Sequence, residues 1–299
     1  SFALGACSAS TDDGAEAQDD ALISAPPFGD EPHGVATRHP IVLEHGFAGS
    51  SDARSIWAFN GVKEALERDG HTVHLSSVPP FNSAAVRARE LAKHVRLAQE
   101  ECHAKPRCDA TRVHIIAHSF GGLDAREYIS VQHKNDHAVM SLTTISTPHH
   151  GTNVADVGLA ALSALDGNAT LQGELKDGAD WIAQNLALTF TSPELARNGD
   201  LRAALAELAE ANDKHFNDTH PDDPRVVYWT YAGVSGSKFL GFHNPQDDID
   251  CEGTLHTYRN RRDFTDGLLK VPATLTAHGT QARPNDGMAT VLSAKWDST

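Results

Sequence analysis

Short apolar runs and amphipathic stretches alternate along the first half of the chain. Four runs rich in β-branched residues are typical of buried parallel strands, and they begin at His39, His71, Val113 and Ala138. Between them, residues 56–69 predict a helix that Gly70 ends, and a longer helix begins at Asn82 or Ser83. Its apolar face consists of Leu91, Val95, Ala98 and Cys102. The alternation predicts an α/β fold, a mostly parallel sheet with helices on both faces.

The pattern changes after residue 152. Residues 153–195 contain two apolar helical pieces, 157–162 and 181–190, separated by a polar segment. Such an insertion predicts a mobile helical lid whose apolar inner face covers a site. The alternative is a helical insertion that packs in a fixed position. A helix over 201–216 and a strand over 226–233 follow, and we expect residues 234–284 to be rich in loops.

The third apolar run leads into a turn with the pattern small-x-Ser-x-Gly. Val113–Ile116 precedes Ala117, Ser119 and Gly121, and a helix-compatible segment follows. Strand, turn and helix in this order are typical of a nucleophile elbow, which exposes a serine hydroxyl to a histidine and to helix amides. An ordinary strand-loop-helix joint is the alternative, and Ala117 stands where glycine is commoner. Ser119 is therefore the candidate nucleophile.

The strand that begins at His39 opens into a glycine-rich segment, residues 45–49. Serine hydrolases of the α/β type place an oxyanion-hole amide after an early strand of this kind. The backbone N–H of Phe47 is therefore a candidate donor, with an ordinary strand-to-helix loop as the alternative.

Length and charge limit the class of protein. With 299 residues and 40% hydrophobic composition, the chain can bury the core of one large domain, which we place at residues 38–299. The formal net charge of −15 argues against a nucleic-acid partner, because phosphate binding needs basic clusters. No apolar run approaches the length of a membrane-spanning helix.

The N-terminal segment, residues 1–37, predicts export. It does not begin with methionine, and Leu4-Gly5-Ala6-Cys7 resembles the lipobox of a bacterial lipoprotein signal peptide. With such a lipobox, Cys7 would be lipidated and would anchor the protein to a membrane. The acidic stretch after Cys7 contains no Lys or Arg and predicts a flexible tether. A chance Leu-x-x-Cys in a flexible tail is the alternative.

The cysteines are consistent with export. Cys102 and Cys108 flank a short loop that an exported protein could close as a disulfide, whereas two free thiols are the alternative in a reducing compartment. Cys251 has no evident partner.

Six motifs follow one another along the chain. They are residues 45–49 (HGFAG), 81–83 (FNS), 117–122 (AHSFGG), 147–152 (TPHHGT), 228–233 (YWTYAG) and 285–288 (NDGM). In this order they resemble the bacterial true lipases of the Pseudomonas and Burkholderia type, over roughly residues 39–291. The resemblance implies an α/β-hydrolase fold, a helical lid, and hydrolysis of acylglycerols as the activity. It also implies Ser119 as nucleophile, Asp286 as triad acid, and the backbone amides of Phe47 and Phe120 as oxyanion-hole donors.

The resemblance also bears on cofactors and partners. The family holds a structural calcium, and Asp266 resembles one of its ligands, although Asp263 lies close by. No cofactor is expected for catalysis. His149 and His150 are adjacent but lack a third ligand at a usual spacing, so we expect no zinc site. A lipid or other ester is the expected substrate, and a folding chaperone is a further partner to consider.

The triad histidine is the largest departure from the family. In this fold the order is Ser, acid, His, yet no histidine follows Asp286 in this sequence. We expect that the sequence is cut before its catalytic base, as it also looks cut at its start. The alternative that keeps the order is His278 paired with one of four earlier acids, namely Asp247, Asp250, Asp263 or Asp266.

These observations predict a serine carboxylic-ester hydrolase, foremost a triacylglycerol lipase, exported to the medium or held at the outer membrane or cell surface. A short-chain esterase or a polyester depolymerase fits the same motifs. A non-catalytic surface lipoprotein on a hydrolase scaffold is an answer of a different class, because fold alone does not determine function.

Overall fold

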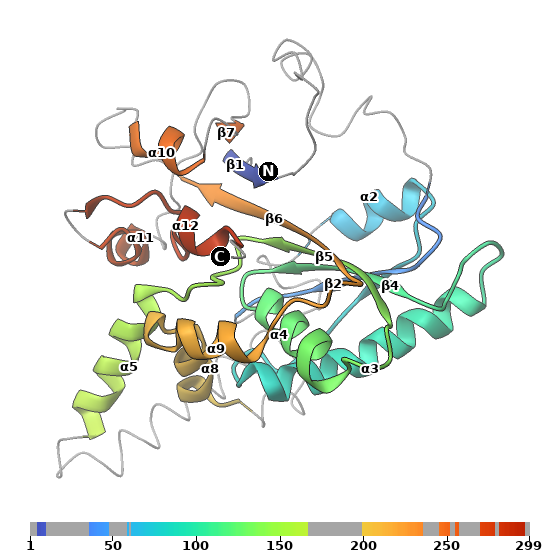
Figure 1. The fold of residues 1–299 in the computed structure, drawn as a ribbon, viewed down its shortest axis with the longest axis horizontal. Coiled ribbons are helices and arrows are strands. Elements are labelled where there is room, and N and C mark those ends of the chain that lie inside the picture. Colours follow the sequence, from blue (N-terminus) through green and yellow to red (C-terminus); the bar gives the residue numbers. More distant parts are fainter. Residues whose placement is uncertain are drawn as a thin grey trace.

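A mixed sheet forms the centre of the computed structural model (Figure 1). The structure describes residues 5–9, 36–47, 59, 61–166, 199–235, 245–251, 255–256, 270–278 and 281–296. Its strands are β1 (Gly5–Ala9), β2 (Ile41–Glu44), β3 (Val73–Leu75), β4 (Val113–His118), β5 (Val139–Ile145), β6 (Val227–Val234) and β7 (Leu255–His256). They lie in the order β3-β2-β4-β5-β6-β1-β7.

The strands β2 to β6 are mutually parallel, which confirms the mostly parallel sheet. In the register, Ile41 of β2 pairs with both Val73 of β3 and His114 of β4, and Ile145 of β5 pairs with Tyr231 of β6. The strands β1 and β7 are antiparallel additions beyond β6. Because β2 and β4 are neighbours and parallel, the segments that leave their carboxyl ends meet at one edge of the sheet.

Helices cover both faces of the sheet, as predicted. They are α2 (Val62–Arg68), α3 (Ala84–His103), α4 (Gly121–Glu127), α5 (Asn153–Asp166), α8 (Leu201–Leu208), α9 (Asp213–Thr219), α10 (Pro245–Asp250), α11 (Lys270–Thr276) and α12 (Val291–Ala294). Alternate residues of β2 separate the two faces: Val42 joins the core with Leu91 of α3, whereas Ile41 and Leu43 pack in the cluster that includes Leu66 of α2.

Residues 5–9, which include most of the predicted lipobox and the first two residues after it, form β1. The backbone of Gly5–Ala9 pairs with β6, and Cys7 lies opposite Ala232 and Leu255. Without β1, β6 would expose unpaired backbone groups along its edge, and a short segment of small residues can satisfy them. Residues 1–4 and 10–35 lie outside the described residues, so the flexible tether stays a prediction.

The predicted helix over 201–216 is interrupted. The helix α8 ends at Leu208, Ala209 is extended with ψ near 140°, and the 3₁₀ turn η2 (Glu210–Asn212) leads into α9. A tertiary contact accounts for the break, since the Glu210 amide donates to the carboxylate of Asp156 in α5 at 2.9 Å. Contacts from distant residues thus override the local periodicity.

One other expectation changes in the C-terminal half, and one stays open. The segment 234–284, expected to be loop-rich, contains α10, β7 and α11. In the insertion 153–195, α5 covers residues 153–166, and the remainder lies outside the described residues, so the lid stays a prediction. Among the described helices, none has the length and apolar character of a membrane span.

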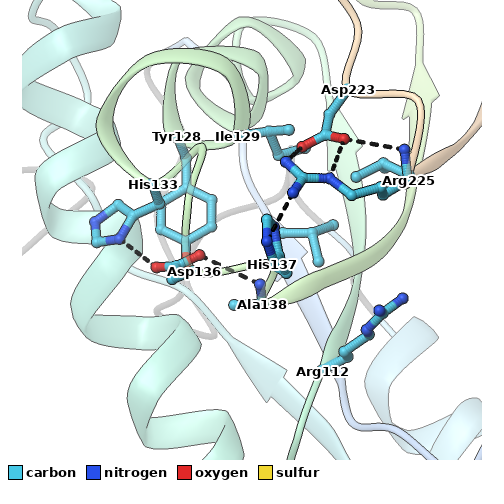
Figure 2. A pocket seen from close by; sticks show the side chains of 11 residues that line it. Arg112, Tyr128, Ile129, His133, Asp136, His137, Ala138, Asp223 and Arg225 are labelled. Atoms are coloured by element: carbon cyan, nitrogen blue, oxygen red, sulfur yellow. Dashed lines mark hydrogen bonds and ion pairs between the residues drawn. The ribbon is translucent and has the colours of Figure 1, made fainter.

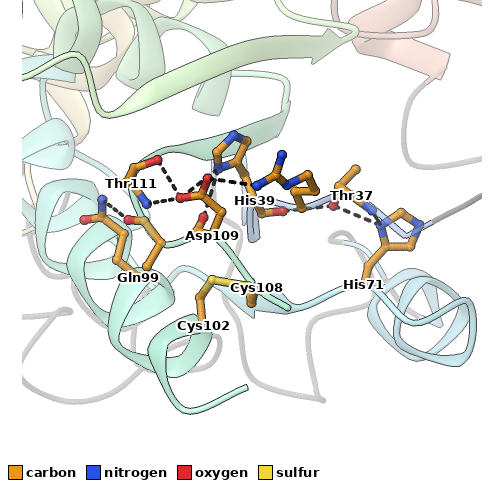
Figure 3. The surroundings of a disulfide bond; sticks show 10 residues. Thr37, His39, His71, Gln99, Cys102, Cys108, Asp109 and Thr111 are labelled. Carbon is orange, nitrogen blue, oxygen red and sulfur yellow. Dashed lines mark hydrogen bonds and ion pairs between the residues drawn. A yellow bond between two sulfur atoms is a disulfide. The ribbon is translucent and has the colours of Figure 1, made fainter. Parts of the chain in front are cut away.

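The predicted disulfide between Cys102 and Cys108 is present (Figure 3). It joins the last turn of α3 to the segment that enters β4, with 5.3 Å between the two Cα atoms. Gln99 reinforces the joint by donating to the carbonyl of Ala110 at 2.9 Å. Cys251, for which the sequence suggested no partner, is also disulfide-bonded and fully buried.

Candidate active site

Ser119 occupies the sharp turn between β4 and α4. Its φ of 53° lies in the left-handed region, which non-glycine residues rarely adopt outside strained, functional turns. Neighbouring segments hold this backbone: the Ser119 N–H donates to the carbonyl of Ile145 at 2.8 Å, and the Ser119 carbonyl accepts from the Thr147 hydroxyl at 2.8 Å. The predicted strand, turn and helix are therefore confirmed, with Thr147 as a support that sequence reasoning missed.

The loop after β2 passes directly over Ser119. A Cβ atom added to Gly46 would lie 2.6 Å from Ser119 Cβ and 3.1 Å from Ser119 Oγ, so a larger residue does not fit there. Phe47 follows, and its ring packs edge-on against Phe81 with 4.8 Å between the ring centroids. The structure thus brings the predicted oxyanion loop to the candidate nucleophile.

The backbone amides of Phe47 and Phe120 donate no hydrogen bond within the described part of the chain. The carbonyl of Gly46, which shares a peptide plane with the Phe47 amide, accepts from the buried Arg87 guanidinium at 3.4 Å. In a trans peptide the N–H points opposite to the C=O, so the Phe47 amide points away from Arg87. Fixed donors of this kind suit an oxyanion hole.

His45 is a neutral imidazole that holds the oxyanion loop in place through two hydrogen bonds. Burial, followed by the charge of Arg87, lowers its pKa to about 3. Its Nε2 atom accepts from the Val78 N–H at 3.2 Å, so the proton sits on Nδ1, which donates to the Gly46 carbonyl at 2.9 Å. His45 is thereby occupied on both nitrogens and holds the loop.

A buried charged layer lies beneath this loop and was missed by sequence reasoning. Glu44, Arg87 and Asp124 are all 0% exposed, and Arg87 Nε donates to Asp124 Oδ2 at 2.8 Å. Two signals were present in the sequence: Glu44 ends an otherwise apolar strand, and Arg87 lies four residues before Leu91 on the apolar face of α3.

Asp286, the predicted triad acid, lies at the carboxyl end of β6. A Cβ atom added to Gly233 would lie 2.9 Å from Asp286 Cβ and 3.5 Å from its Oδ2. The other oxygen, Oδ1, accepts from the backbone amides of Met288 and Ala289 at 2.8 Å each. Burial lowers the pKa of His118, and the negative charge of Asp286 opposes that effect, which places the acid near the residue that precedes Ser119.

The alternative triad built on His278 is not supported. His278 Nε2 lies 2.9 Å from a carboxylate oxygen of Glu210, which is none of the four acids considered. Asp263 and Asp266 lie outside the described residues. No described histidine is hydrogen-bonded to Ser119 or Asp286, so the position of the base stays open.

The residues considered for metal binding are Asp266 for calcium and the adjacent His149 and His150 for zinc. Asp266, the predicted calcium ligand, lies outside the described residues, and among the described ones no group of three His, Cys, Asp or Glu side chains could hold a metal ion. His149 is buried against the Thr144 hydroxyl at 3.0 Å, and His150 contacts Asp213 at 2.9 Å. Both histidines lie in the loop after β5, and their side-chain partners belong to β5 and α9.

A separate pocket lies beside the start of β5 (Figure 2). Most of its charged groups are paired with one another: Asp223 with Arg225, Arg225 with His137 at 2.7 Å, and His133 with Asp136 at 2.6 Å. Arg112, which also lines the pocket, donates instead to the sulfur of Met140 at 3.3 Å. Paired side chains of this kind stabilise a surface loop, and they leave no nucleophile or base converging on the pocket.

The family model described as the alpha/beta hydrolase fold matches residues 39–200, more than half of the chain. The chain is 27% identical over 236 residues to triacylglycerol lipase 2 of Saccharomyces cerevisiae, covering 79% of this chain and 56% of that protein. It is 29% identical over 269 residues to a triacylglycerol lipase of Vibrio cholerae, covering 79% and 82%.

Among solved structures, the lipase of Staphylococcus hyicus matches with a TM-score of 0.57 and 19% identity, covering 88% of this chain and 80% of that chain. At this identity the likeness concerns the fold. This chain spans only about half the length of the yeast lipase, so activity, substrate and partners do not transfer from that relative directly.

Proposed function

This chain belongs to the α/β-hydrolase fold family, and from that premise we propose that it is a serine carboxylic-ester hydrolase that cleaves acylglycerols. The main support is the strained Ser119 between β4 and α4, together with the amides of Phe47 and Phe120, which donate to none of the described residues. The lipases among its relatives support the choice of substrate class.

In the proposed reaction, Ser119 Oγ attacks the ester carbonyl carbon while a histidine takes the hydroxyl proton. The negative charge that develops on the carbonyl oxygen is stabilised by the amides of Phe47 and Phe120. Collapse expels the alcohol, which receives the proton from the histidine, and leaves an acyl group on Ser119. Water then releases the acid by the same steps. Asp286 orients the histidine and stabilises its cationic form.

Hydrolysis of p-nitrophenyl esters tests the proposal on the full-length protein. We expect hydrolysis by the wild type, and a loss of several orders of magnitude for Ser119→Ala, because the acyl-enzyme cannot form. Ser163→Ala is the matched control, since Ser163 is exposed on α5. Preference for long acyl chains supports a lipase, and preference for short chains supports an esterase. Equal activity of Ser119→Ala and the wild type would overturn the proposal.

Export belongs to the same proposal. The Cys102–Cys108 disulfide supports an oxidising compartment, where such bonds persist. A structural calcium and a folding chaperone stay predictions. Lipidation of Cys7 competes with the disulfide at Cys251, because Cys7 is the one cysteine of the sequence left after Cys102 pairs with Cys108. Recovery of the protein from the cytoplasm with reduced thiols at Cys102 and Cys108 would contradict export.

A further inference from the structure

Two carboxyl groups and one guanidinium lie together in a fully buried layer beneath the oxyanion loop. Glu44 is the last residue of β2, Arg87 belongs to α3, and Asp124 lies in the first turn of α4. All three side chains are 0% exposed. With both acids ionised, this layer would carry a net charge of −1 away from water, which is costly in a protein interior.

The hydrogen bonds of this layer leave one oxygen of each carboxyl without a donor. Glu44 Oε2 accepts from the Ser76 hydroxyl, and Asp124 Oδ2 accepts from Arg87 at 2.7 to 2.8 Å. Glu44 Oε1 is 3.8 Å from the nearest Arg87 nitrogen, beyond hydrogen-bond length. Glu44 Oε1 and Asp124 Oδ1 therefore stay buried and unpartnered. One proton on Glu44 would give both oxygens a partner.

The surrounding charges favour that proton. Burial and then the charge of Asp124 hold the pKa of Glu44 well above its usual value, against the opposing effects of Arg87 and Ser76. Burial raises the pKa of Asp124 to about 6, with Arg87 opposing and Glu207 of α8 adding to the rise. His45 beside the layer stays neutral, so Arg87 is the cation that acts on both acids.

The same layer joins the two segments that carry the proposed oxyanion donors. Glu44 is three residues before Phe47, and Asp124 is four residues after Phe120. A Cβ atom added to Gly121 would lie 2.8 Å from the Glu44 carbonyl oxygen and 2.9 Å from Glu44 Cγ, so the end of β2 touches the start of α4. A bond between Glu44 and Asp124 would fix the spacing of the two donors.

We propose that Glu44 and Asp124 share one proton at neutral pH, with Glu44 Oε1 donating to Asp124 Oδ1, and that this bond positions the oxyanion loop against the nucleophile helix. Glu44 is thus a positioning residue held as a neutral acid. The positioning role rests on the proposed function, whereas the shared proton does not.

Infrared spectroscopy at neutral pH tests the shared proton directly. A protonated carboxylic acid gives a carbonyl band that ionised, exposed carboxylates lack. We expect this band in the wild type, its shift on ¹³C labelling of glutamate, and its loss in Glu44→Gln. Glu64→Gln, the same change at an exposed position of α2, should retain it. Asp124→Asn is a second variant: its carboxamide can donate to an ionised Glu44, so the band should disappear there too. Absence of the band in the wild type, or its persistence in a folded Glu44→Gln, overturns the proposal.

Unfolding and turnover provide the other two readouts. Because the folded pKa of Glu44 is raised, its contribution to stability is full at low pH and is lost as pH rises, by up to about tenfold in the folding equilibrium constant per pH unit. Glu44→Gln should lack this slope, and equal slopes in Glu44→Gln and the wild type would contradict the shared proton.

In turnover, Glu44→Leu should lower kcat by about tenfold or more with little change in KM, and Glu44→Gln should restore kcat. An inactive wild type that shows the infrared band refutes the proposed function alone, and unchanged kcat in Glu44→Leu refutes the positioning role.

Discussion

Arg87 holds the oxyanion loop from a position with no exposure to solvent. It donates to the carbonyls of His45 and Gly46 and to the carboxylate of Asp124. Replacing it with methionine removes these donors and leaves buried carboxyl groups without their cation. We expect Arg87→Met to lower the free energy of unfolding by about 3–5 kcal/mol, measured by urea denaturation.

A lysine variant separates charge from geometry at Arg87, and a change at Arg89 serves as the control. Arg87→Lys keeps the cation but not the planar fork of donors, so it should recover only part of the loss. Arg89→Met changes an exposed arginine of the same helix and should alter the unfolding free energy by less than about 0.5 kcal/mol. Similar values for the Arg87 and Arg89 methionine variants would show that the buried layer contributes little.

Single residues differ in how far the sequence reveals them. Ser119 could be predicted because its strand, turn and helix are consecutive in the chain. Glu44, Arg87 and Asp124 could not be joined, since they lie on three elements separated by about 40 residues each, and a charged residue in a sequence is normally solvated. Asp286 was found through a motif resemblance, and its proximity to His118 depends on the parallel order of β4, β5 and β6.

At the scale of elements, the Cys102–Cys108 disulfide fixes the end of α3 (Figure 3). Closing a loop of this length restricts the unfolded chain by about 2 kcal/mol in the loop-entropy model. We expect the Cys102→Ala, Cys108→Ala double variant to lose about that much stability in urea denaturation. Cys108→Ala alone breaks the cross-link but keeps the buried sulfur of Cys102, so a smaller loss in the single variant measures the contribution of packing. No loss in either would exclude stabilisation by the bond.

The elements themselves were predictable where local pattern and tertiary packing agree. The cap at Ser83, the apolar face of α3 and the parallel strands follow from neighbouring residues alone. The break at Ala209 required Asp156, more than 50 residues away, to bind the Glu210 amide. The helices α10 and α11 are short and lack a long apolar period, so the sequence around them resembled loop.

At the scale of the whole molecule, Glu127 opposes Glu44 in its response to pH. Glu127 ends the nucleophile helix and contacts His220, which lies in the segment between α9 and β6. Burial raises the pKa of Glu127, but hydrogen bonds from His220 and Gln132 outweigh it and hold the pKa below its usual value. A lowered folded pKa means that the stabilisation is present above the unfolded value and is lost as pH falls through the folded one.

Stability should therefore decline on both sides of a maximum, through Glu127 as pH falls and through Glu44 as pH rises. Urea denaturation across pH measures the acid side, where one proton accounts for at most about 1.4 kcal/mol per pH unit. We expect Glu127→Gln to flatten the acid side only, and Glu100→Gln, an exposed change on α3, to leave the whole curve as it is. An unchanged acid slope in Glu127→Gln would mean that other carboxyl groups dominate there. Because α4 carries Glu127 at one end and meets Glu44 at the other, the two slopes report on opposite ends of the helix that presents Ser119.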